Sequence, residues 1–281
     1  MAELDAESNA GVCGDRMHSF LFSPGVYNTR VNKASTGEPS IIFKNEDFIV
    51  IDKPAGLMVH GVRISGKHRS ATDRAEEPTL VDWLLPRFPE IRSVGDDPTT
   101  RPGIVHRLDK ATSGVMIVAR TQASFERLKK LFQEHRMRKT YVALTYGIPK
   151  KEQGIIDAPI GIKNGSLKRS IHSSKMAKPA VTEYSVVKKL AKKSDGSGGD
   201  GYALLKVNPK TGRTHQIRVH LASLGNPIVG DPLYGNKGRA AGAPRLMLHA
   251  AMLEFSDDSG NSFAFEAPLP ADFTYPQETS S

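Results

Sequence analysis

Two short, uninterrupted apolar runs limit the fold of this chain more than any other feature of its sequence. They are Phe48-Ile49-Val50-Ile51 and Val115-Met116-Ile117-Val118-Ala119. Runs of this length, rich in Val and Ile, are typical of strands that are buried on both faces. A turn signal built from Pro54 and Gly56 follows the first run. The sequence therefore predicts a sheet that is covered on both sides.

The other predicted elements mix helices and strands without a strict βαβ rhythm. Apolar residues recur at three- and four-residue steps from Phe125 to Phe132, which predicts a helix over 121–134. A second helix is expected from Thr214 to Leu224, with Thr214 as its cap and Gly225 beyond its end. A short helix is predicted at 79–85, and strands at 41–43, 138–146, 182–190 and 202–207. The mixture favours an α+β domain with a mixed sheet.

The chain has 281 residues, a length typical of one or two domains. Residues 1–38 are rich in Ser, Asn, Gly and acidic side chains, so a flexible N-terminal arm is expected there. A single folded domain is expected over 39–275 and a short tail over 276–281. Within the domain, a polar loop at 64–77 and a flexible hairpin tip at 192–201 are expected.

Several classes of protein are disfavoured. No apolar run approaches the length of a membrane-spanning helix. The early acidic residues do not resemble a signal peptide, and the single Cys13 cannot form an internal disulfide. The sequence is typical of a cytoplasmic protein with no membrane partner.

Positive charge is concentrated in one part of the chain. The net charge is +9, yet residues 120–220 hold 22 Lys or Arg against 7 Asp or Glu. Such a concentration suits a polyanionic partner, and nucleic acid is the leading candidate. A solvated lysine surface is the alternative on charge alone. Composition does not distinguish a protein that binds nucleic acid from one that modifies it.

Two segments gather polar side chains that packing does not require. Residues 101–114 (RPGIVHRLDKATSG) place His, Arg, Asp, Lys, Thr and Ser in a loop before the second apolar run. Functional groups are often carried by loops that a rigid element supports. Residues 208–220 (NPKTGRTHQIRVH) place Arg213 at the start of a predicted helix, where an anionic partner is favoured.

Residues 101–114 resemble the HRLDxxTSG signature of the RluA family of RNA pseudouridine synthases. Further resemblances follow along the chain in family order. They are DKPAGLMVH at 52–60, RKTY at 138–141, KPAVT at 178–182, TGRTHQIR at 211–218, GDPLYG at 230–235 and LMLHA at 246–250. The resemblance implies the pseudouridine synthase fold, a catalytic domain on a mixed, largely antiparallel β-sheet flanked by helices. It also implies a cofactor-free isomerase that converts uridines in structured RNA to pseudouridine.

The resemblance implies roles for individual residues. Asp109 occupies the family's catalytic aspartate position, and its carboxylate would attack or deprotonate the sugar or base. Arg213 matches the arginine that pairs with this aspartate, and Tyr141 the tyrosine that stacks on the flipped uracil. The other expected substrate contacts are Arg107 at the vacated base stack, Leu248 in the uracil pocket, Lys139, His106 and Thr112.

Three other functions were weighed against this one. An RNA-binding domain without catalysis explains the charge but gives Asp109, Arg213 and Tyr141 no shared purpose. Residues 109–112 (DKAT) and 199–201 (GDG) are similar to the DKTGT and GDG motifs of aspartyl phosphoryl transferases, but no second carboxylate for Mg²⁺ follows Asp109 at short spacing. His215, His220 and His249 could be metal ligands, but His215 and His220 are five residues apart and lie on different helical faces, so no metal site is predicted.

The expected partner is ribosomal or transfer RNA, and the sequence does not decide between the two. Many family members carry an N-terminal S4-type RNA-binding domain, and the arm over 1–38 is too short and too acidic to supply one. The basic surface of the catalytic domain is therefore expected to select the RNA. A monomer without an obligate protein partner is expected.

Overall fold

The structure is a computed structural model that describes residues 37–61, 77–163, 168–173, 175–190, 201–235 and 243–274. The expected arm at 1–38, polar loop at 64–77 and hairpin tip at 192–201 lie almost wholly outside these residues. The expected tail at 276–281 lies entirely outside them. In the described part of the chain, no helix is long and apolar enough to span a membrane.

One nine-stranded sheet organises the described residues, in the order β1-β2-β3-β10-β4-β9-β8-β5 with β11 on β10. Among these strands only β3 and β10 pair in parallel. The bounds are β1 Ser40–Lys44, β2 Phe48–Lys53, β3 Ser113–Ala119, β4 Arg138–Tyr146, β5 Gln153–Asp157, β8 Val181–Leu190, β9 Tyr202–Pro209, β10 Leu248–Ser256 and β11 Ser262–Glu266. A small hairpin, β6 Gly161–Ile162 with β7 Arg169–Ser170, stands apart from the sheet. The predicted mixed, largely antiparallel α+β fold is confirmed.

The two apolar runs are strands β2 and β3, and every residue in both strands is buried. They pair with each other along their whole length, from Phe48 opposite Ala119 to Lys53 opposite Gly114. Sheet strands covered on both faces show such continuous apolar runs because neither face meets water.

The helices are α2 Leu80–Leu84, the 3₁₀ helix η1 Pro89–Ser93, α3 Gln122–Gln133 and α4 Gln216–Ser223. The α3 helix begins at a capping box in which the Thr121 side chain accepts the Ser124 N–H. Its apolar face, Phe125, Leu128 and Leu131, is buried against β3 and neighbouring strands, as predicted. Helix α4 begins two residues later than predicted, and Thr214 does not cap it, because His215 holds the N-cap position in a left-handed conformation.

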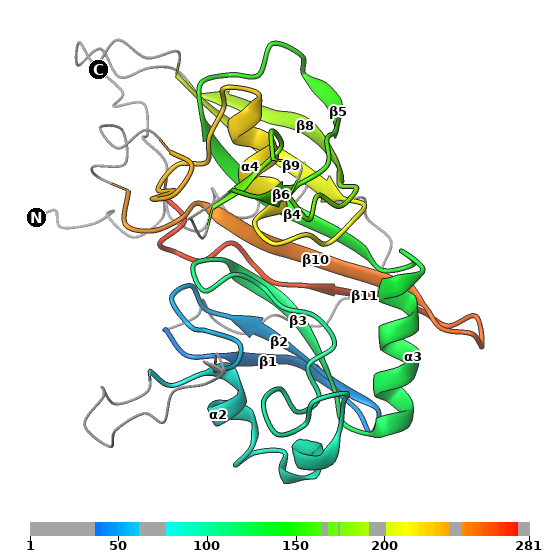
Figure 1. Ribbon diagram of the computed structural model, residues 1–281. Helices are drawn as coiled ribbons and strands as arrows, with labels where there is room; N and C mark the ends of the chain where they lie inside the picture. Colours follow the sequence, from blue (N-terminus) through cyan, green and yellow to red (C-terminus); the bar gives the residue numbers. More distant parts are fainter. Residues whose placement is uncertain are drawn as a thin grey trace, which may run out of the picture.

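Strand β10 crosses the middle of the molecule and was not predicted. Figure 1 shows β1, β2, β3 and α2 on one side of β10, and β4, β8, β9 and α4 on the other. Gly114 of β3 has a φ of 117°, and a Cβ there would collide with the Ala250 carbonyl of β10. A glycine at this position therefore allows β3 to pair with β10 directly after the loop at 101–112.

Candidate active site

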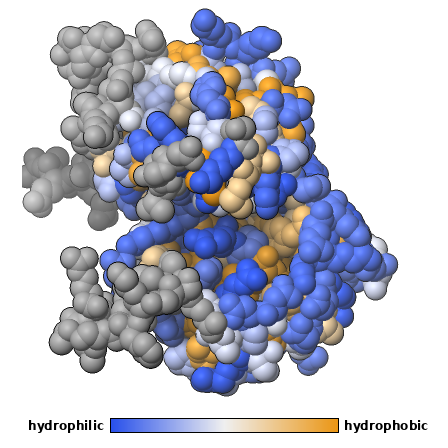
Figure 2. Space-filling view, in the orientation of Figure 1, coloured by the Kyte–Doolittle hydropathy of each residue, from blue (hydrophilic) through white to orange (hydrophobic). Residues whose placement is uncertain are grey.

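A cavity of about 590 Å³ lies between the two halves of the molecule. Figure 2 shows it as a hollow across the middle of this face, with polar and apolar residues along its walls. One wall is the loop that precedes β3, and the opposite wall comes from β4, the β9–α4 loop and α4. The two polar segments that the sequence singled out therefore face each other across one cleft.

Asp109 is bound by an arginine from the opposite wall. The Nη1 atom of Arg218 donates to Oδ2 of Asp109 at 3.1 Å. The Arg218 side chain is 5% exposed and the Asp109 side chain 23% exposed, so the carboxylate reaches solvent and the guanidinium does not. An ion pair that is sheltered in this way is screened much less than one on an open surface.

The rest of the Arg218 guanidinium binds a second carboxylate. Its Nε and Nη2 atoms donate to the two oxygens of Asp231, each at 2.8 Å. Burial acts to raise the pKa of Asp231, but Arg218 and the N–H groups of Leu233 and Tyr234 outweigh it, so the pKa is lowered. Arg218 is thus held as a planar fork by a carboxylate that stays ionised.

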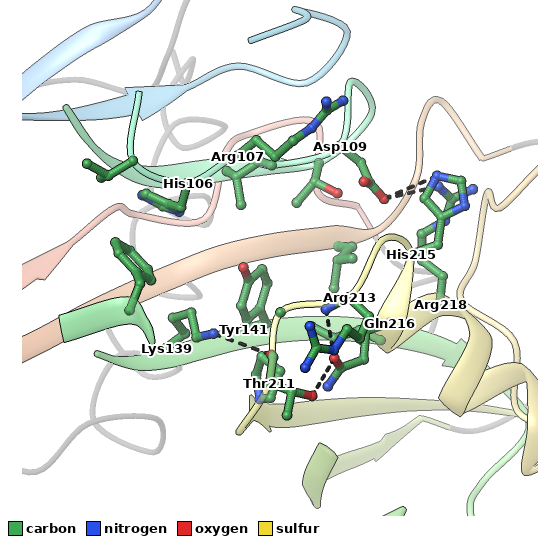
Figure 3. Close-up of a pocket in the computed structure, with 18 of the residues that line it drawn as sticks. His106, Arg107, Asp109, Lys139, Tyr141, Thr211, Arg213, His215, Gln216 and Arg218 are labelled. Atoms are coloured by element: carbon green, nitrogen blue, oxygen red, sulfur yellow. Dashed lines mark hydrogen bonds and ion pairs between the residues drawn. The ribbon is translucent and has the colours of Figure 1, made fainter. Parts of the chain in front are cut away.

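The prediction that Arg213 pairs with Asp109 is wrong. The Nε atom of Arg213 donates to the Pro179 carbonyl at 3.0 Å, and its backbone N–H donates to Oε1 of Gln216. Arg213 lies in the loop before α4, whereas Arg218 is inside the helix and faces Asp109 (Figure 3). The sequence places Arg213 and Arg218 in the same motif, and residue type alone does not distinguish which of the two is buried beside Asp109.

Gln216 fixes the shape of the β9–α4 loop. Its Oε1 atom accepts from the Thr211 hydroxyl at 2.6 Å as well as from the Arg213 backbone. Its Nε2 atom donates to the Val181 carbonyl and the Thr182 hydroxyl of β8. The Gln216 side chain is 4% exposed, and both its oxygen and its nitrogen form hydrogen bonds. It therefore holds the β9–α4 loop against the sheet.

Tyr141 and Leu248 supply the apolar part of the cleft. Tyr141 extends from β4 across the cavity from Asp109 (Figure 3). Burial, with a contribution from the charge of Asp109, raises the pKa of the Tyr141 hydroxyl above its usual range. Leu248 is the first residue of β10 and is 3% exposed at the cavity wall.

Lys139 and Thr112 also line the cavity. The Nζ atom of Lys139 donates to the Thr211 carbonyl at 3.4 Å, and burial lowers the pKa of Lys139 to about 8. The Thr112 backbone N–H donates to the Asp109 carbonyl, which closes a turn around the candidate catalytic residue. Thr112 is 2% exposed, so it supports this turn more than it faces solvent.

His106 and Arg107 lie on the same wall as Asp109. The Nε2 atom of His106 accepts the Ile117 N–H at 3.1 Å, and the ring stacks on Phe132. Burial lowers the pKa of His106, so the ring is neutral and anchors the loop to β3. Arg107 is exposed, and its Nη1 atom donates to Nε2 of His60 at 3.3 Å.

A buried lysine supports the loop from beneath, and the sequence analysis did not single it out. Lys53 is 0% exposed, and its Nζ atom donates to the carbonyls of Pro54, Leu57 and Lys110. Burial, followed by the charge of Arg245, lowers the pKa of Lys53 to about 7. The side chain of Lys53 thus donates to three backbone carbonyls, and these hydrogen bonds join the turn after β2 to Lys110, which is next to Asp109.

The three histidines weighed as metal ligands have separate partners. His215 bonds Tyr234, His220 bonds Thr182, and His249 bonds Ser113. In the described ranges no group of three or more His, Cys, Asp or Glu side chains could hold a metal ion. The GDG motif weighed for phosphoryl transfer includes Asp200, which lies outside those ranges.

Comparison with known proteins gives one consistent result. The model of the RNA pseudouridylate synthase family matches residues 47–223. The chain is 36% identical over 236 residues to the dual-specificity RNA pseudouridine synthase RluA of Escherichia coli, covering 83% of this chain and 93% of that protein. It is 37% identical over 259 residues to the ribosomal large subunit pseudouridine synthase D of Nitrosomonas europaea, covering 87% of this chain and 66% of that protein.

A solved structure agrees with these relatives. The human RNA pseudouridylate synthase domain containing 1 protein superimposes with a TM-score of 0.63 at 29% identity, covering 85% of this chain and 86% of that one. The lengths of the relatives differ, and the chain spans only 59% and 63% of two others, from Aquifex aeolicus and Chloroflexus aurantiacus.

Proposed function

The chain belongs to the RluA-type RNA pseudouridine synthases, and from this we propose that it isomerises uridines in structured RNA to pseudouridine, with Asp109 as the catalytic carboxylate. The observation that carries the proposal is the Asp109–Arg218 pair, which holds one carboxylate at the wall of an open cleft opposite Tyr141. The Asp109 side chain is 23% exposed while its arginine partner is buried, which supports a role for the carboxylate in chemistry.

The reaction makes limited demands on the protein. The N1–C1′ bond of the uridine breaks, the base turns, and a C5–C1′ bond forms. The C5 position loses a proton and N1 gains one, so atoms and electrons balance without a group donor or a redox partner. The reacting group would attack C1′ or remove a sugar proton, and Arg218 holds the Asp109 carboxylate in place for either step.

The rest of the cleft is suited to a base taken out of its stack. Extruding a nucleotide from folded RNA costs a few kcal/mol. In our proposal Tyr141 stacks on the uracil, which contributes about 1–3 kcal/mol, and Leu248 forms the apolar end of the pocket. Arg107, which is exposed on the opposite wall, fills or braces the vacated position in the RNA.

The same proposal assigns the basic side chains of the cleft. Lys139 and Arg213 lie on the wall across from Asp109, where they contact RNA phosphates. His106 and Thr112 act indirectly, because they hold the loop that carries Asp109. Arg213 is therefore reassigned from the reacting pair to RNA binding.

We propose ribosomal or transfer RNA as the substrate class. The net positive stretch over 120–220 supports a large anionic substrate. One relative is described as acting on the large ribosomal subunit and another as a dual-specificity enzyme, so both classes belong in the test. We propose that the protein acts as a monomer in the cytoplasm, where ribosomal and transfer RNA occur.

One mapping experiment tests the proposal. Pseudouridine positions in total RNA are compared between cells with the gene, cells without it, and cells that carry only the Asp109→Asn form. We expect at least one ribosomal or transfer RNA site that disappears in both of the last two. Identical maps in all three, with the protein expressed and folded, would reject the proposed activity.

A further inference from the structure

His215 is held beside Asp109 by an unusual backbone conformation. It is the N-cap of α4 and has φ 58° and ψ 19°, in the left-handed region. Such a conformation costs a non-glycine residue free energy, and it persists where surrounding contacts enforce it. The conformation turns the ring toward the cleft, with Nε2 3.8 Å from Oδ2 of Asp109 (Figure 3).

A chain of hydrogen bonds reaches Nδ1 of His215 and bears on which ring nitrogen carries the proton. The backbone N–H of Arg169, in β7, donates to the Tyr234 hydroxyl oxygen at 2.8 Å. The same hydroxyl lies 3.0 Å from Nδ1 of His215, its only acceptor among the described residues. Because a backbone N–H can only donate, the phenolic proton is free to point at Nδ1. The phenolic proton can bind Nδ1 when the neutral ring of His215 carries its own proton on Nε2, the atom that faces Asp109.

Burial favours the neutral form of the His215 ring, and charged groups face the ring from four elements. Asp109 faces it from the loop before β3, Arg218 from α4, Asp231 from the turn before Tyr234, and Arg169 from β7. Burial is the largest influence and lowers the pKa of His215, with the two arginines adding to it against the two carboxylates. A neutral imidazole can donate one N–H to a carboxylate without adding a second positive charge beside Arg218.

Both donors approach the same oxygen of Asp109. Nη1 of Arg218 is 3.1 Å from Oδ2 and Nε2 of His215 is 3.8 Å from the same atom. Within the described residues, these hydrogen bonds and ion pairs reach Oδ2 and not Oδ1. The carboxylate is thus oriented with one oxygen directed at protein donors and the other toward the open cleft.

Resting on the proposed function, we propose that His215 is a positioning residue that directs its Nε2–H at Oδ2 of Asp109 and, with Arg218, leaves Oδ1 as the reacting oxygen. The 3.8 Å gap closes to a hydrogen bond when substrate fills the cleft, as catalytic hydrogen bonds often tighten in complexes. Tyr234 takes part by fixing the tautomer of His215.

Two substitutions at position 215 separate this role from simple packing. The amide nitrogen of Gln can reach the place of Nε2, whereas the amide of Asn reaches only the place of Nδ1. We expect His215→Gln to keep the single-turnover rate within about threefold, and His215→Asn to lose about 10- to 100-fold, because misplacing a reacting group by about 1 Å can cost 100-fold. RNA affinity should stay within about twofold in both, since phosphate contacts dominate it.

The acidic limb of the pH–rate profile provides a second test of the role proposed for His215. Loss of a donor makes a carboxylate harder to ionise, so the limb should move to higher pH in His215→Asn and Tyr234→Phe but not in His215→Gln. His220→Gln is the matched control, because His220 is a buried histidine of the same helix that bonds Thr182 and Ala158. It should lower the melting temperature without moving the limb. Equal rates and profiles in His215→Asn and wild type would overturn the proposal.

A measurement on the protein without RNA keeps this inference separate from the proposed activity. Two-bond ¹H–¹⁵N correlations report which nitrogen of a neutral imidazole is protonated, and the His215 signals are those missing from His215→Gln. We expect the Nε2–H form in wild type and a mixture in Tyr234→Phe. An Nδ1–H form in wild type would overturn the inference even if the enzyme is active. If wild type forms no pseudouridine, the proposed function fails together with the reacting-oxygen assignment that rests on it.

Discussion

Nη1 of Arg218 lies 3.1 Å from Oδ2 of Asp109, while Nε and Nη2 of the same guanidinium bind Asp231. One arginine therefore links the carboxylate of the cleft to a fully buried one. Asp231 in turn accepts the backbone N–H groups of Leu233 and Tyr234, so the turn over 230–235 sets the position of the whole group. The GDPLYG motif at 230–235 therefore holds Arg218 in position beside Asp109.

Arg218→Ala should abolish isomerisation and also destabilise the fold. It leaves the buried Asp231 carboxylate without its partner, which costs about 3–5 kcal/mol. Arg218→Lys should recover little of either, because an ammonium cannot form the planar fork. Urea unfolding and single-turnover rates measure the two effects.

Arg213→Ala is the matched control from the same motif. Arg213 donates to a backbone carbonyl in the loop before α4, so its loss should leave the saturated rate nearly unchanged. The salt slope of RNA binding should fall by about one unit, as for one lost phosphate contact. A collapsed rate in Arg213→Ala with a normal rate in Arg218→Ala would contradict the assignment of the pair.

Lys53→Met should lower the free energy of unfolding by about 2–4 kcal/mol, because three buried carbonyls lose their donor. Lys110→Met serves as the control, since the Lys110 side chain is 48% exposed and pairs with the exposed Glu77. It should change stability by less than about 1 kcal/mol. Urea denaturation at pH 8 compares the two, and equal stabilities would show that the buried lysine does not support the loop.

Acid should destabilise the protein through His249. Burial lowers the pKa of this histidine to about 4, whereas the unfolded chain takes up the proton near 6.5. The stabilisation is therefore complete above pH 6.5 and is lost as the pH falls toward 4, up to about 3 kcal/mol.

Comparison with His249→Gln isolates this effect from other titrating groups. Asp52 has the opposite effect on stability as the pH falls. Burial raises its pKa to about 6, so Asp52 binds a proton more tightly in the folded protein than in the unfolded chain. The difference in unfolding free energy between wild type and variant should shrink from pH 7 to pH 4. A difference that stays constant with pH would exclude a neutral buried His249.

Deleting residues 1–36 should leave activity on a minimal stem-loop within about threefold, since we expect RNA affinity to come from phosphate contacts of the residues around the cleft. The motivation is that the residues lining the cavity lie between 60 and 248. Single-turnover rates on the same RNA compare the two proteins. A loss above about tenfold in a truncation with an unchanged melting temperature would assign the N-terminal segment to substrate binding.

Local sequence patterns predicted those helices and strands whose residue types favour the conformation that they adopt. Strand β4 occupies 138–146 as predicted, because the segment is rich in Tyr, Thr and Val, which are enriched in strands. Strand β10 was missed because Ala250, Ala251, Met252 and Leu253 are good helix formers. Its strand conformation comes from pairing with β3, β4 and β11, which are distant in sequence.

In the candidate active site, too, local sequence predicted some features, and others depend on the three-dimensional structure. The TGRTHQIR motif pointed to the correct segment of the chain but to the wrong arginine. Whether Arg213 or Arg218 reaches Asp109 depends on where α4 begins, and that is set by the left-handed His215 and the side chain of Gln216. Backbone strain and side-chain caps of this kind have no signature in residue type alone, so only the three-dimensional structure could reveal the pair.

The most direct test of the account is the single-turnover release of tritium from RNA that carries [5-³H]uridine, because the C5 hydrogen is lost when the new C–C bond forms. We predict release by wild type and none by Asp109→Asn, with RNA affinity within several-fold because phosphate contacts dominate binding. Release by the Asn protein at even about a tenth of the wild-type rate would contradict the central claim, since a reacting carboxylate contributes far more than that.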